Sequence, residues 1–430
     1  MQNSALVTAA TLALLTGSAA GQSTSPRYQR EIAGLMEHPA IQRAFGAVLE
    51  LEPSTHATLL ELTEIPAPPF MEEARGRRFA ELLAEAGADS VWTDAVGNVI
   101  GLRRGRGGAR TVALDGHLDT VFPEGTDVTV RVRGDTLFAP GIGDDTRGLA
   151  VVLAVLRALE QAGVETEADL LFVGTVGEEG LGDLRGMKHL FREGAEPIDA
   201  WIAIDGGDLD RLITMGLGSV RYRTTFKGPG GHSWGAFGLP NPVHAMARGV
   251  RYFQDAADTL TRKGPITSYN VGRIGGGTSV NSVPFEAWME VDMRSESPAS
   301  LTGIEAAFVA AMRRALVEEN LLRREGPPLT LDNARIGDRP SGELDPDVPL
   351  IQRALAATRA VGGVPEVGRS STNANVPIAL GVPAITLGRG GVGDLGHAPG
   401  EWWLNRDGHL AIQRALLVVV AEAGLAGIVG

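Results

Sequence analysis

The chain of 430 residues contains no cysteine, so disulfide bonds, thiolate metal sites and a cysteine nucleophile are excluded. It also lacks a long basic run, and its 39 Lys and Arg stand against 52 Asp and Glu, a net charge of −13. Nucleic acid and anionic membranes need a positive protein face, so neither is expected as a partner. No stretch beyond the N-terminal segment is long and apolar enough to span a bilayer, so we expect no membrane span in the mature chain. Any metal site must be built from His, Asp and Glu.

The N-terminal segment MQNSALVTAATLALLTGSAAGQS has an apolar centre followed by small residues, as signal peptides have before their cleavage site. It has no Lys or Arg ahead of the apolar part, and the first basic residue is Arg27. We expect residues 1–28 to be a signal peptide and leader, which places the mature protein outside the cell or in a periplasm. If the segment is not a signal peptide, the protein is expected in the cytoplasm.

The rest of the chain alternates apolar strand-like runs with amphipathic helical segments, which is typical of an α/β fold. Between residues 212 and 337 the order changes to strand, helix, strand, strand, helix, strand, the order of a ferredoxin-like unit. We therefore predict a mostly parallel-sheet domain from residues 29–211 and 338–430, with 212–337 inserted as a dimerisation or lid domain. The polar stretch SYNVGRIGG in the insert is expected to be an edge strand that pairs with a second subunit in a homodimer.

Residues able to bind a metal stand at the ends of successive strands and loops. These are His117 with Asp119, Asp144 with Asp145, Glu178 with Glu179, and Asp205. In a parallel sheet such ends lie on one edge, where open α/β sheets bind their ligands. Two adjacent acids also fit a solvated turn, and an Asp before a helix also fits an N-cap. The coincidence of all these ends favours a metal site.

Zinc takes imidazole and carboxylate ligands, and two zinc ions bridged by one carboxylate hold an oxygen between them. The candidate ligands are His117, Asp144, Glu179, Asp205 and His397. They supply two zinc ions per chain if Asp144 bridges, and cobalt or manganese would bind the same ligands. Glu178, beside a ligand, is placed to take a proton from the bridging water.

The motifs HLDT, GIGDDTRG, GEEG, AIDGG and GHAPGEW, in this order and approximate spacing, resemble those of the dinuclear zinc exopeptidases and deacylases. That family includes peptidase T, bacterial glutamate carboxypeptidase, succinyl-diaminopimelate desuccinylase and aminoacylase. The resemblance runs from about Leu59 to the C-terminus. It implies one zinc on His117 and Asp205, a second on Glu179 and His397, and Asp144 as the bridge.

The resemblance also implies that Glu178 is general base and then acid, and that Asp119 orients the His117 ring. The sequence departs from the family pattern in two places. Thr146 and Arg147 follow Asp145 where Lys is common, and STNAN carries Asn373 where the family usually has an acid. The second departure concerns a substrate or supporting contact, not the metal ligands.

Further candidates lie in the insert and near the C-terminus. In the family, the His of FKGPGGHSW, here His232, reaches the active site of the partner subunit and polarises the scissile carbonyl. Asn281 and Arg294 resemble residues that bind the substrate's carbonyl or carboxylate, and Gly388 is a further candidate for substrate binding. Taken alone, His232, Asn281 and Arg294 fit a turn histidine with satisfied hydrogen bonds, a β-turn asparagine and a surface arginine.

The resemblance thus implies a zinc hydrolase that cleaves an amide bond next to a terminal group of a small peptide or acylated amino acid. The GEEGLGDLRG context is similar to the peptidase T branch and favours an exopeptidase. An N-acyl amino acid deacylase on the same site is the alternative, and a non-catalytic binding or dimerisation protein is the remote one.

Overall fold

The computed structural model describes residues 24–427, so most of the predicted signal peptide lies outside the described residues. Helix α1 (Pro26–Glu37) begins within the predicted leader, with Pro26 at its first turn and Tyr28 buried. The predicted leader of residues 1–28 was therefore too long by its last residues. They begin an amphipathic helix whose buried face also holds Ile32 and Leu35.

The large domain is built on a nine-stranded sheet. Its strands are, in spatial order, β1 (Ser90–Thr93), β2 (Val99–Arg103), β6 (Asp169–Thr175), β3 (Thr111–His117), β7 (Ala200–Ile204), β17 (Ala384–Leu387), β8 (Arg211–Gly216) and β15 (Gly342–Glu343), with β16 (Glu366–Ser370) paired to β8. The central strands β6, β3, β7 and β17 are parallel, while β2 and β8 join them antiparallel. The sheet is therefore mixed, with its parallel part in the middle, and the predicted α/β class is confirmed.

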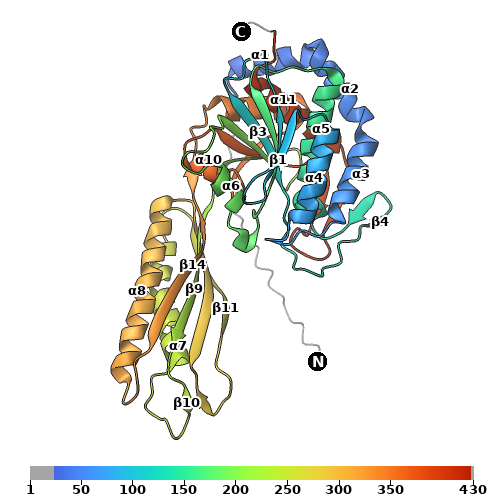
Figure 1. Ribbon diagram of the computed structural model, residues 1–430. Coiled ribbons are helices and arrows are strands. Elements are labelled where there is room, and N and C mark those ends of the chain that lie inside the picture. The colour runs from blue at the N-terminus through green and yellow to red at the C-terminus, as the bar shows by residue number, and fades with distance from the viewer. Residues whose placement is uncertain (1–23, 428–430) are drawn as a thin grey trace, which may run out of the picture.

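Helices cover both faces of this sheet (Figure 1). One face carries α1, α2 (Pro39–Glu50), α3 (Glu52–Thr63), α4 (Glu73–Glu85), α5 (Arg147–Ala162), α9 (Pro349–Ala360) and α11 (Gly408–Ala423). The other carries α6 (Arg185–Leu190) and α10 (Asn375–Ala379). Successive side chains of a strand alternate between the two cores. Val112 and Leu114 of β3 face the first helix layer, and Ala113 faces the second.

A smaller four-stranded antiparallel sheet lies beside the large one. It consists of β18 (Val392–Asp394), β19 (Trp402–Leu404), β5 (Thr136–Phe138) and β4 (Arg131–Arg133). Trp403 of β19 is buried against Ile142 and Ala150, which ties this sheet to the start of α5. Among residues 24–427, every helix is too short or too polar to cross a bilayer.

The inserted domain is a four-stranded antiparallel sheet with two helices on one face. Its strands are β9 (Gly218–Lys227), β11 (Thr267–Gly276), β13 (Glu286–Ser295) and β14 (Thr330–Arg339), in the order β11-β13-β9-β14, and its helices are α7 (Pro242–Thr261) and α8 (Pro298–Leu322). This is the predicted ferredoxin-like arrangement, with β11 at an edge as expected. Figure 1 shows the domain as an elongated arm, and the short pair β10 (Gly231–His232) and β12 (Ser282–Val283) lies at its far end.

The predicted insert boundaries, 212 and 337, are corrected by the sheet pairing. β8 belongs to the large sheet through β16 and β17, so the insert begins with β9 at Gly218 and ends with β14 at Arg339. The run LITMG in β8 has a strand pattern, but such a pattern does not say which of two sheets the strand joins.

Candidate metal centre

Three parallel strands deliver metal-binding side chains to one edge of the large sheet. β3 ends at His117, Asp205 directly follows β7, and Glu178 and Glu179 stand just beyond β6. β3 is aligned with both neighbours, so that His117 lies opposite Thr175 of β6. The strand ends that the sequence pattern placed at one edge therefore do lie together there.

Asp144 and His397 reach the same edge from loops. Asp144 lies in the turn Ile142–Thr146 before α5, and His397 lies between β18 and β19. Asp144 Oδ1 lies 3.0 Å from His117 Nε2, and Asp144 Oδ2 lies 3.2 Å from His397 Nε2. His397 Nε2 is also 2.9 Å from Glu179 Oε1. Asp144 thus faces the two histidines with different oxygens, as a bridging carboxylate does.

The candidate ligand atoms form overlapping groups. Within each of two sets of three residues these atoms lie within 4.8 Å of one another, namely His117, Asp144 and Asp205, and Asp144, Glu179 and His397. A third set, His117 with Glu178 and Glu179, overlaps both. Imidazole nitrogens and carboxylate oxygens are ligands that zinc accepts. Because the first two sets share Asp144, the donors present fit two adjacent ions.

Asp119 supports this edge differently from the expectation. His117 Nδ1 donates to the Asp119 main-chain carbonyl at 2.9 Å, which leaves Nε2 directed toward Asp144. The Asp119 carboxylate is 3.8 Å from that ring and instead accepts the main-chain N–H groups of Glu178 at 3.0 Å and Glu179 at 2.8 Å. Asp119 therefore orients His117 through its backbone and fixes the two glutamates through its side chain.

Glu401 holds the turn that carries Asp144, a role that the sequence analysis missed. Its carboxylate accepts the main-chain N–H groups of Gly141 at 2.6 Å, Gly143 at 2.8 Å and Asp144 at 2.9 Å. A Cβ on Gly143 would lie 2.9 Å from Glu401 Oε1, so glycine there allows the close approach. The sequence did contain a signal for this role, because Glu401 is the acid of the GHAPGEW motif.

Burial and mutual repulsion shift the pKa values of the carboxyl groups at this edge. Burial raises the pKa of Glu178 to about 8 and that of Asp205 to about 6, and nearby carboxylates add to both shifts. Burial also opposes ionisation of Asp144, but hydrogen bonds from His117 and His397 outweigh it and hold the Asp144 pKa below its usual range. Hydrogen bonds to Asp144 and Glu179 raise the pKa of His397 to about 10. A divalent cation would displace the protons of Asp205 and His397, because side chains bind metal ions in their deprotonated form.

Arg339, the last residue of β14, brings the inserted domain to the metal edge. Its Nη1 donates to Glu178 Oε1 at 3.1 Å, and its Nη2 donates to the Glu178 carbonyl oxygen. Both side chains are buried. The sequence analysis did not single out Arg339, since only the docking of the insert on the large domain shows that it meets Glu178.

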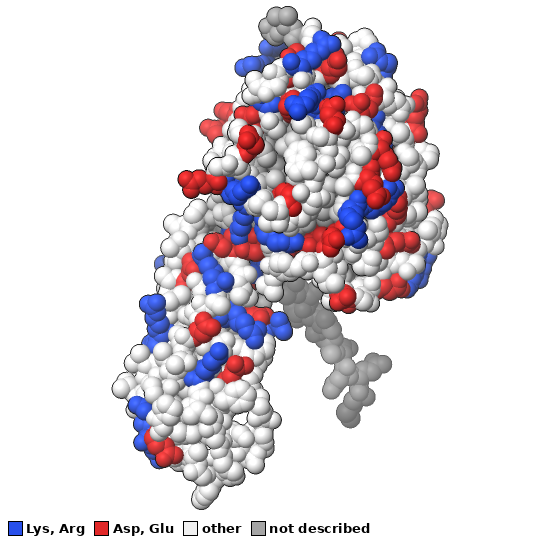
Figure 2. Space-filling view, viewed as in Figure 1, with Lys and Arg blue, Asp and Glu red and all other residues white. Residues whose placement is uncertain are grey.

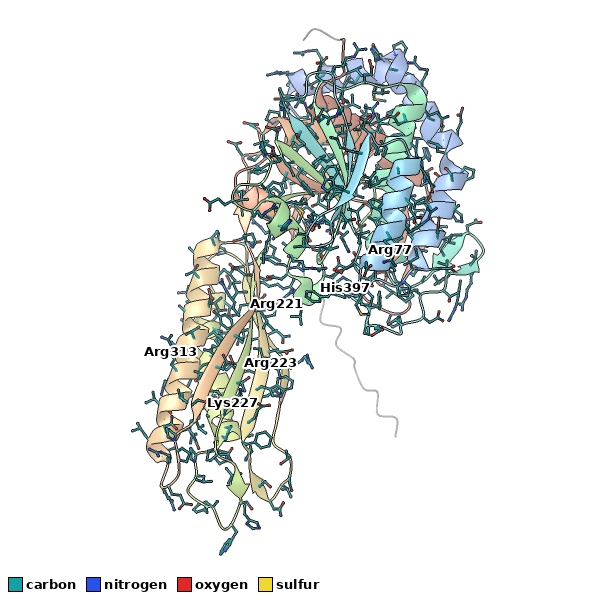
Figure 3. All side chains as sticks on the ribbon, viewed as in Figure 1. Arg77, Arg221, Arg223, Lys227, Arg313 and His397 are labelled. Atoms are coloured by element: carbon teal, nitrogen blue, oxygen red, sulfur yellow. The ribbon has the colours of Figure 1, made fainter. Side chains whose placement is uncertain are left out.

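A cleft of about 490 Å³ opens between the two domains at this edge. From the metal edge it is lined by Asp144, Glu178, Glu179, Asp205 and His397. Its arginines are Arg211, Arg221, Arg294, Arg339 and Arg369. Figure 3 places His397 at the lower edge of the large domain and Arg221 at the adjoining end of the inserted domain. On the face shown in Figure 2, basic and acidic side chains lie side by side along this junction.

Of the predicted substrate-binding residues, the cleft contains only Arg294. Arg294 Nε donates to Asp292 Oδ2 at 2.7 Å. Gly388 is not among the residues that line the cleft. Its position is closed by the main chain of Asp208, which a Cβ at residue 388 would overlap, so this glycine serves close packing after β17.

His232 and Asn281 lie together at the far end of the inserted domain (Figure 1). The main-chain N–H of Ser233 donates to the Asn281 carbonyl at 2.9 Å, and both His232 and Asn281 are exposed. Neither residue lines the cleft of its own chain. They are therefore near each other but apart from the metal edge within one subunit.

Asn373, the departure from the family pattern, lies in a buried network under the metal edge. Its Nδ2 donates to Asp115 Oδ2 at 2.5 Å and to Thr175 Oγ1 at 2.7 Å, and Trp201 Nε1 donates to Asp115 Oδ1 at 2.5 Å. Burial raises the pKa of Asp115 to about 7, against the effect of these donors. Asn373 does not line the cleft, so its contact is a supporting one.

The sequence of this chain matches a known protein family. Residues 113–422 match the model of peptidase family M20/M25/M40. Carboxypeptidase G2 of Pseudomonas sp. (strain RS-16) is 26% identical over 311 residues, which cover 69% of this chain and 70% of that protein. Succinyl-diaminopimelate desuccinylase of Corynebacterium glutamicum is 27% identical over 240 residues, 54% of this chain and 64% of that protein.

Solved structures share the fold of this chain. The crystal structure of aminopeptidase PepT from Bacillus cereus ATCC 10987 matches with a TM-score of 0.67 and 19% identity, covering 85% of this chain and 97% of that one. The family match spans the candidate ligands from His117 to His397 and the whole inserted domain. The chain is an enzyme of peptidase family M20/M25/M40.

Proposed function

We propose that this protein is a dinuclear zinc exopeptidase that hydrolyses an amide bond of small peptides. The observation that carries the proposal is the pair of three-residue ligand sets that share Asp144 beside the interdomain cleft. Membership of the peptidase family supports the reaction class. The cleft has the size of a small-molecule site, which fits a short substrate.

In this proposal each chain binds two zinc ions. His117 and Asp205 would hold one, Glu179 and His397 would hold the other, and Asp144 would be shared by both. Bound zinc would polarise the scissile carbonyl and lower the pKa of a water molecule toward ~7. Cobalt or manganese are possible substitutes, because they accept the same nitrogen and oxygen donors.

Glu178 is the proposed general base and acid. It takes a proton from the attacking water and returns it to the leaving amine, which is otherwise too basic to depart. Arg339 contacts its carboxylate at 3.1 Å, and the Asp119 carboxylate holds its main-chain N–H. These contacts support the role because they fix the position of Glu178 beside the ligands without making it one.

His232 is proposed to act in the cleft of a partner subunit. Its Nδ1 accepts the main-chain N–H groups of Trp234 at 3.2 Å and Gly235 at 3.3 Å, which favours the tautomer with a proton on Nε2. A neutral histidine that donates from Nε2 suits the oxyanion that develops on the scissile carbonyl. Asn281, beside it, and Arg294, in the cleft, would contact the substrate's carbonyl or carboxylate.

The surroundings of His232 support a homodimer formed through the inserted domain. Trp234, Phe237 and Val280 at the same end are 87%, 71% and 102% exposed relative to reference values. Figure 2 shows few charged side chains on the far end of this domain. A cluster of exposed apolar side chains is typical of an interaction surface, and the edge strand β11 offers unpaired backbone groups.

The second candidate function is N-acyl amino acid deacylase. It needs the same ligands and the same base, and the desuccinylase relative carries that kind of activity in its name. The carboxypeptidase relative favours the peptidase. A non-catalytic binding protein on this scaffold would turn over neither kind of substrate.

The test is hydrolysis of a panel of free di- and tripeptides and of N-acetyl and N-succinyl amino acids, with zinc, with chelator, and with Glu178→Gln. Cleavage of peptides that requires both the metal and Glu178 supports the exopeptidase. Cleavage of acyl amino acids alone would replace it with the deacylase, and turnover of neither class with metal bound would contradict both.

We further propose that the protein is exported, on the strength of the apolar and small-residue pattern at its N-terminus. Fractionation of cells that produce the full chain tests this. A cytoplasmic protein that keeps its N-terminal segment would contradict it.

A further inference from the structure

The face of the large sheet that carries α6 and α10 is only partly covered toward β1. Helix α6 has six residues, and Leu102 of β2 and Leu171 of β6 stay half-buried although both strands have a neighbouring strand on each side. The strand register contributes to the gap. Ala113 of β3 stands between Leu171 and Trp201 in one row across the sheet, and its small side chain leaves room beside theirs.

A recess of about 540 Å³ lies in this gap. Its lining includes the apolar side chains of Ile100, Leu171 and Trp201, which come from three strands. Trp92 of β1 also lines it and is 43% exposed, so an aromatic surface is available to a ligand. The recess shares no lining residue with the interdomain cleft, and its volume is that of a small-molecule site.

Charged side chains of both signs also line the recess. The exposed side chains of Arg104 and Glu196 each lack an oppositely charged group within 4.0 Å among residues 24–427. The acids Asp94 and Asp169, in contrast, accept main-chain N–H groups of nearby residues. Arg104 and Glu196 therefore offer a cation and an anion to a ligand in the recess.

We propose that this recess binds a free amino acid with an apolar side chain, at a site separate from the metal centre. The apolar side chain would lie on Trp92 and Leu171, where it leaves water. Arg104 would pair with the carboxylate of the ligand and Glu196 with its ammonium group. Both are long side chains that can adjust to two charges carried on one carbon atom.

The proposal goes beyond the proposed function, since the metal centre takes no part in it. Free amino acids are also products of an exopeptidase, but the recess would bind them whatever their source.

Calorimetry of the purified full chain tests the class of ligand. L-Phenylalanine should bind about 10- to 100-fold more tightly than L-serine, which lacks the apolar side chain. 3-Phenylpropionate lacks the ammonium group and phenethylamine lacks the carboxylate, so each should bind about 10-fold more weakly than phenylalanine. Binding of either analogue as tightly as phenylalanine would overturn the proposal.

Two variants locate the bound amino acid. Arg104→Gln and Glu196→Gln, both at exposed positions, should each weaken phenylalanine binding about 10-fold. Arg313→Gln removes an exposed arginine from α8 in the inserted domain (Figure 3), and as the matched control it should leave the affinity unchanged. An affinity for phenylalanine that neither Arg104→Gln nor Glu196→Gln changes would overturn the proposal.

A second copy of the chain is the other occupant that an uncovered sheet face could take. If phenylalanine does not bind and Trp92→Glu dissociates a dimer in sedimentation, the recess is an interface between chains and the proposal is overturned.

Peptide hydrolysis separates this proposal from the proposed function. Arg104→Gln should leave kcat and KM for the hydrolysed substrates unchanged, because Arg104 does not line the interdomain cleft. Phenylalanine binding that depends on Arg104, without hydrolysis of any substrate in the panel, would support the recess and contradict the hydrolase. Hydrolysis by a protein that binds no phenylalanine would do the reverse.

Discussion

The metal edge of the large sheet and the far end of the inserted domain each carry a candidate catalytic or metal-binding histidine. One histidine is buried and the other is exposed. At the metal edge His117 is 1% exposed, and its ring is fixed between the Asp119 carbonyl and Asp144. At the far end His232 is exposed, and its ring accepts hydrogen bonds from the main chain of its own turn. The first site is complete within one chain. The second gains a catalytic context only if another chain supplies it.

The difference shows which candidate site residues a single chain brings together and which it leaves apart. Parallel strands bring His117, Glu179 and Asp205 to one edge of the sheet, and two loops add Asp144 and His397. The five candidate ligands therefore meet within one chain. The arm that carries His232 leads away from that edge (Figure 1). A homodimer in which each arm reaches the other cleft would join the two regions, and the variants below test this division.

The largest effect is expected at the metal edge. Glu178→Gln should lower kcat by about 10³- to 10⁴-fold, because it removes the proton acceptor while preserving the shape of the side chain. Metal content measured on the same protein should be unchanged. Glu61→Gln, on the surface of α3, is the matched control and should keep full activity. A Glu178→Gln protein with more than about a tenth of wild-type activity would remove Glu178 from the mechanism.

His232→Ala should lower kcat by about 10²-fold, since it removes one donor to the developing oxyanion. The sharper measurement mixes it with Glu178→Gln under conditions that exchange subunits. In the mixed dimer one cleft has Glu178 together with the partner's intact His232, so activity should return to about a quarter of the wild-type level. Failure to regain activity, or a fully active monomer in sedimentation, would contradict the proposal that His232 acts in the cleft of the partner subunit.

Glu401→Gln should weaken metal binding by about 10- to 100-fold with the fold intact. One of its two oxygens becomes an NH₂ group, so either the Gly141 N–H or those of Gly143 and Asp144 lose an acceptor. Competition with a zinc indicator measures the change. An unchanged metal affinity would mean that the turn carrying Asp144 does not depend on Glu401.

Asn373→Asp should have the smallest effect on catalysis and act on stability instead. A second acid would stand beside the buried Asp115 in place of the amide donor, which we expect to cost about 1–3 kcal/mol of unfolding free energy. Denaturant unfolding gives this value, and KM should stay within about twofold of wild type, because Asn373 is outside the cleft. A large rise in KM with unchanged stability would make Asn373 a substrate contact.

Sequence reasoning was most successful where a candidate site residue stands at the end of a regular element. His117 ends a buried strand, and Glu178 and Asp205 stand just beyond two others, so their meeting at one edge follows from a parallel sheet. The ferredoxin-like order of the insert was likewise readable, because its strands and helices are long and regular.

What the sequence did not provide depends on contacts between distant segments. It could not show that Asp119 orients His117 with a carbonyl and not a carboxylate, since both lie on the same residue. Arg339 meets Glu178 only when the insert docks on the large domain. The close packing of Gly388 against the main chain of Asp208 likewise depends on a contact between segments distant in sequence.

The most direct test of the central claim, that two ligand sets share Asp144, is the metal content of the purified full chain. After equilibration with zinc and removal of free metal, elemental analysis of the wild type should give about two zinc ions per chain. Asp144→Ala should lose tight binding at both positions, whereas Asp205→Ala should retain one ion. Wild-type protein with no tightly bound metal, or an Asp144→Ala protein that still binds two ions, would contradict the account.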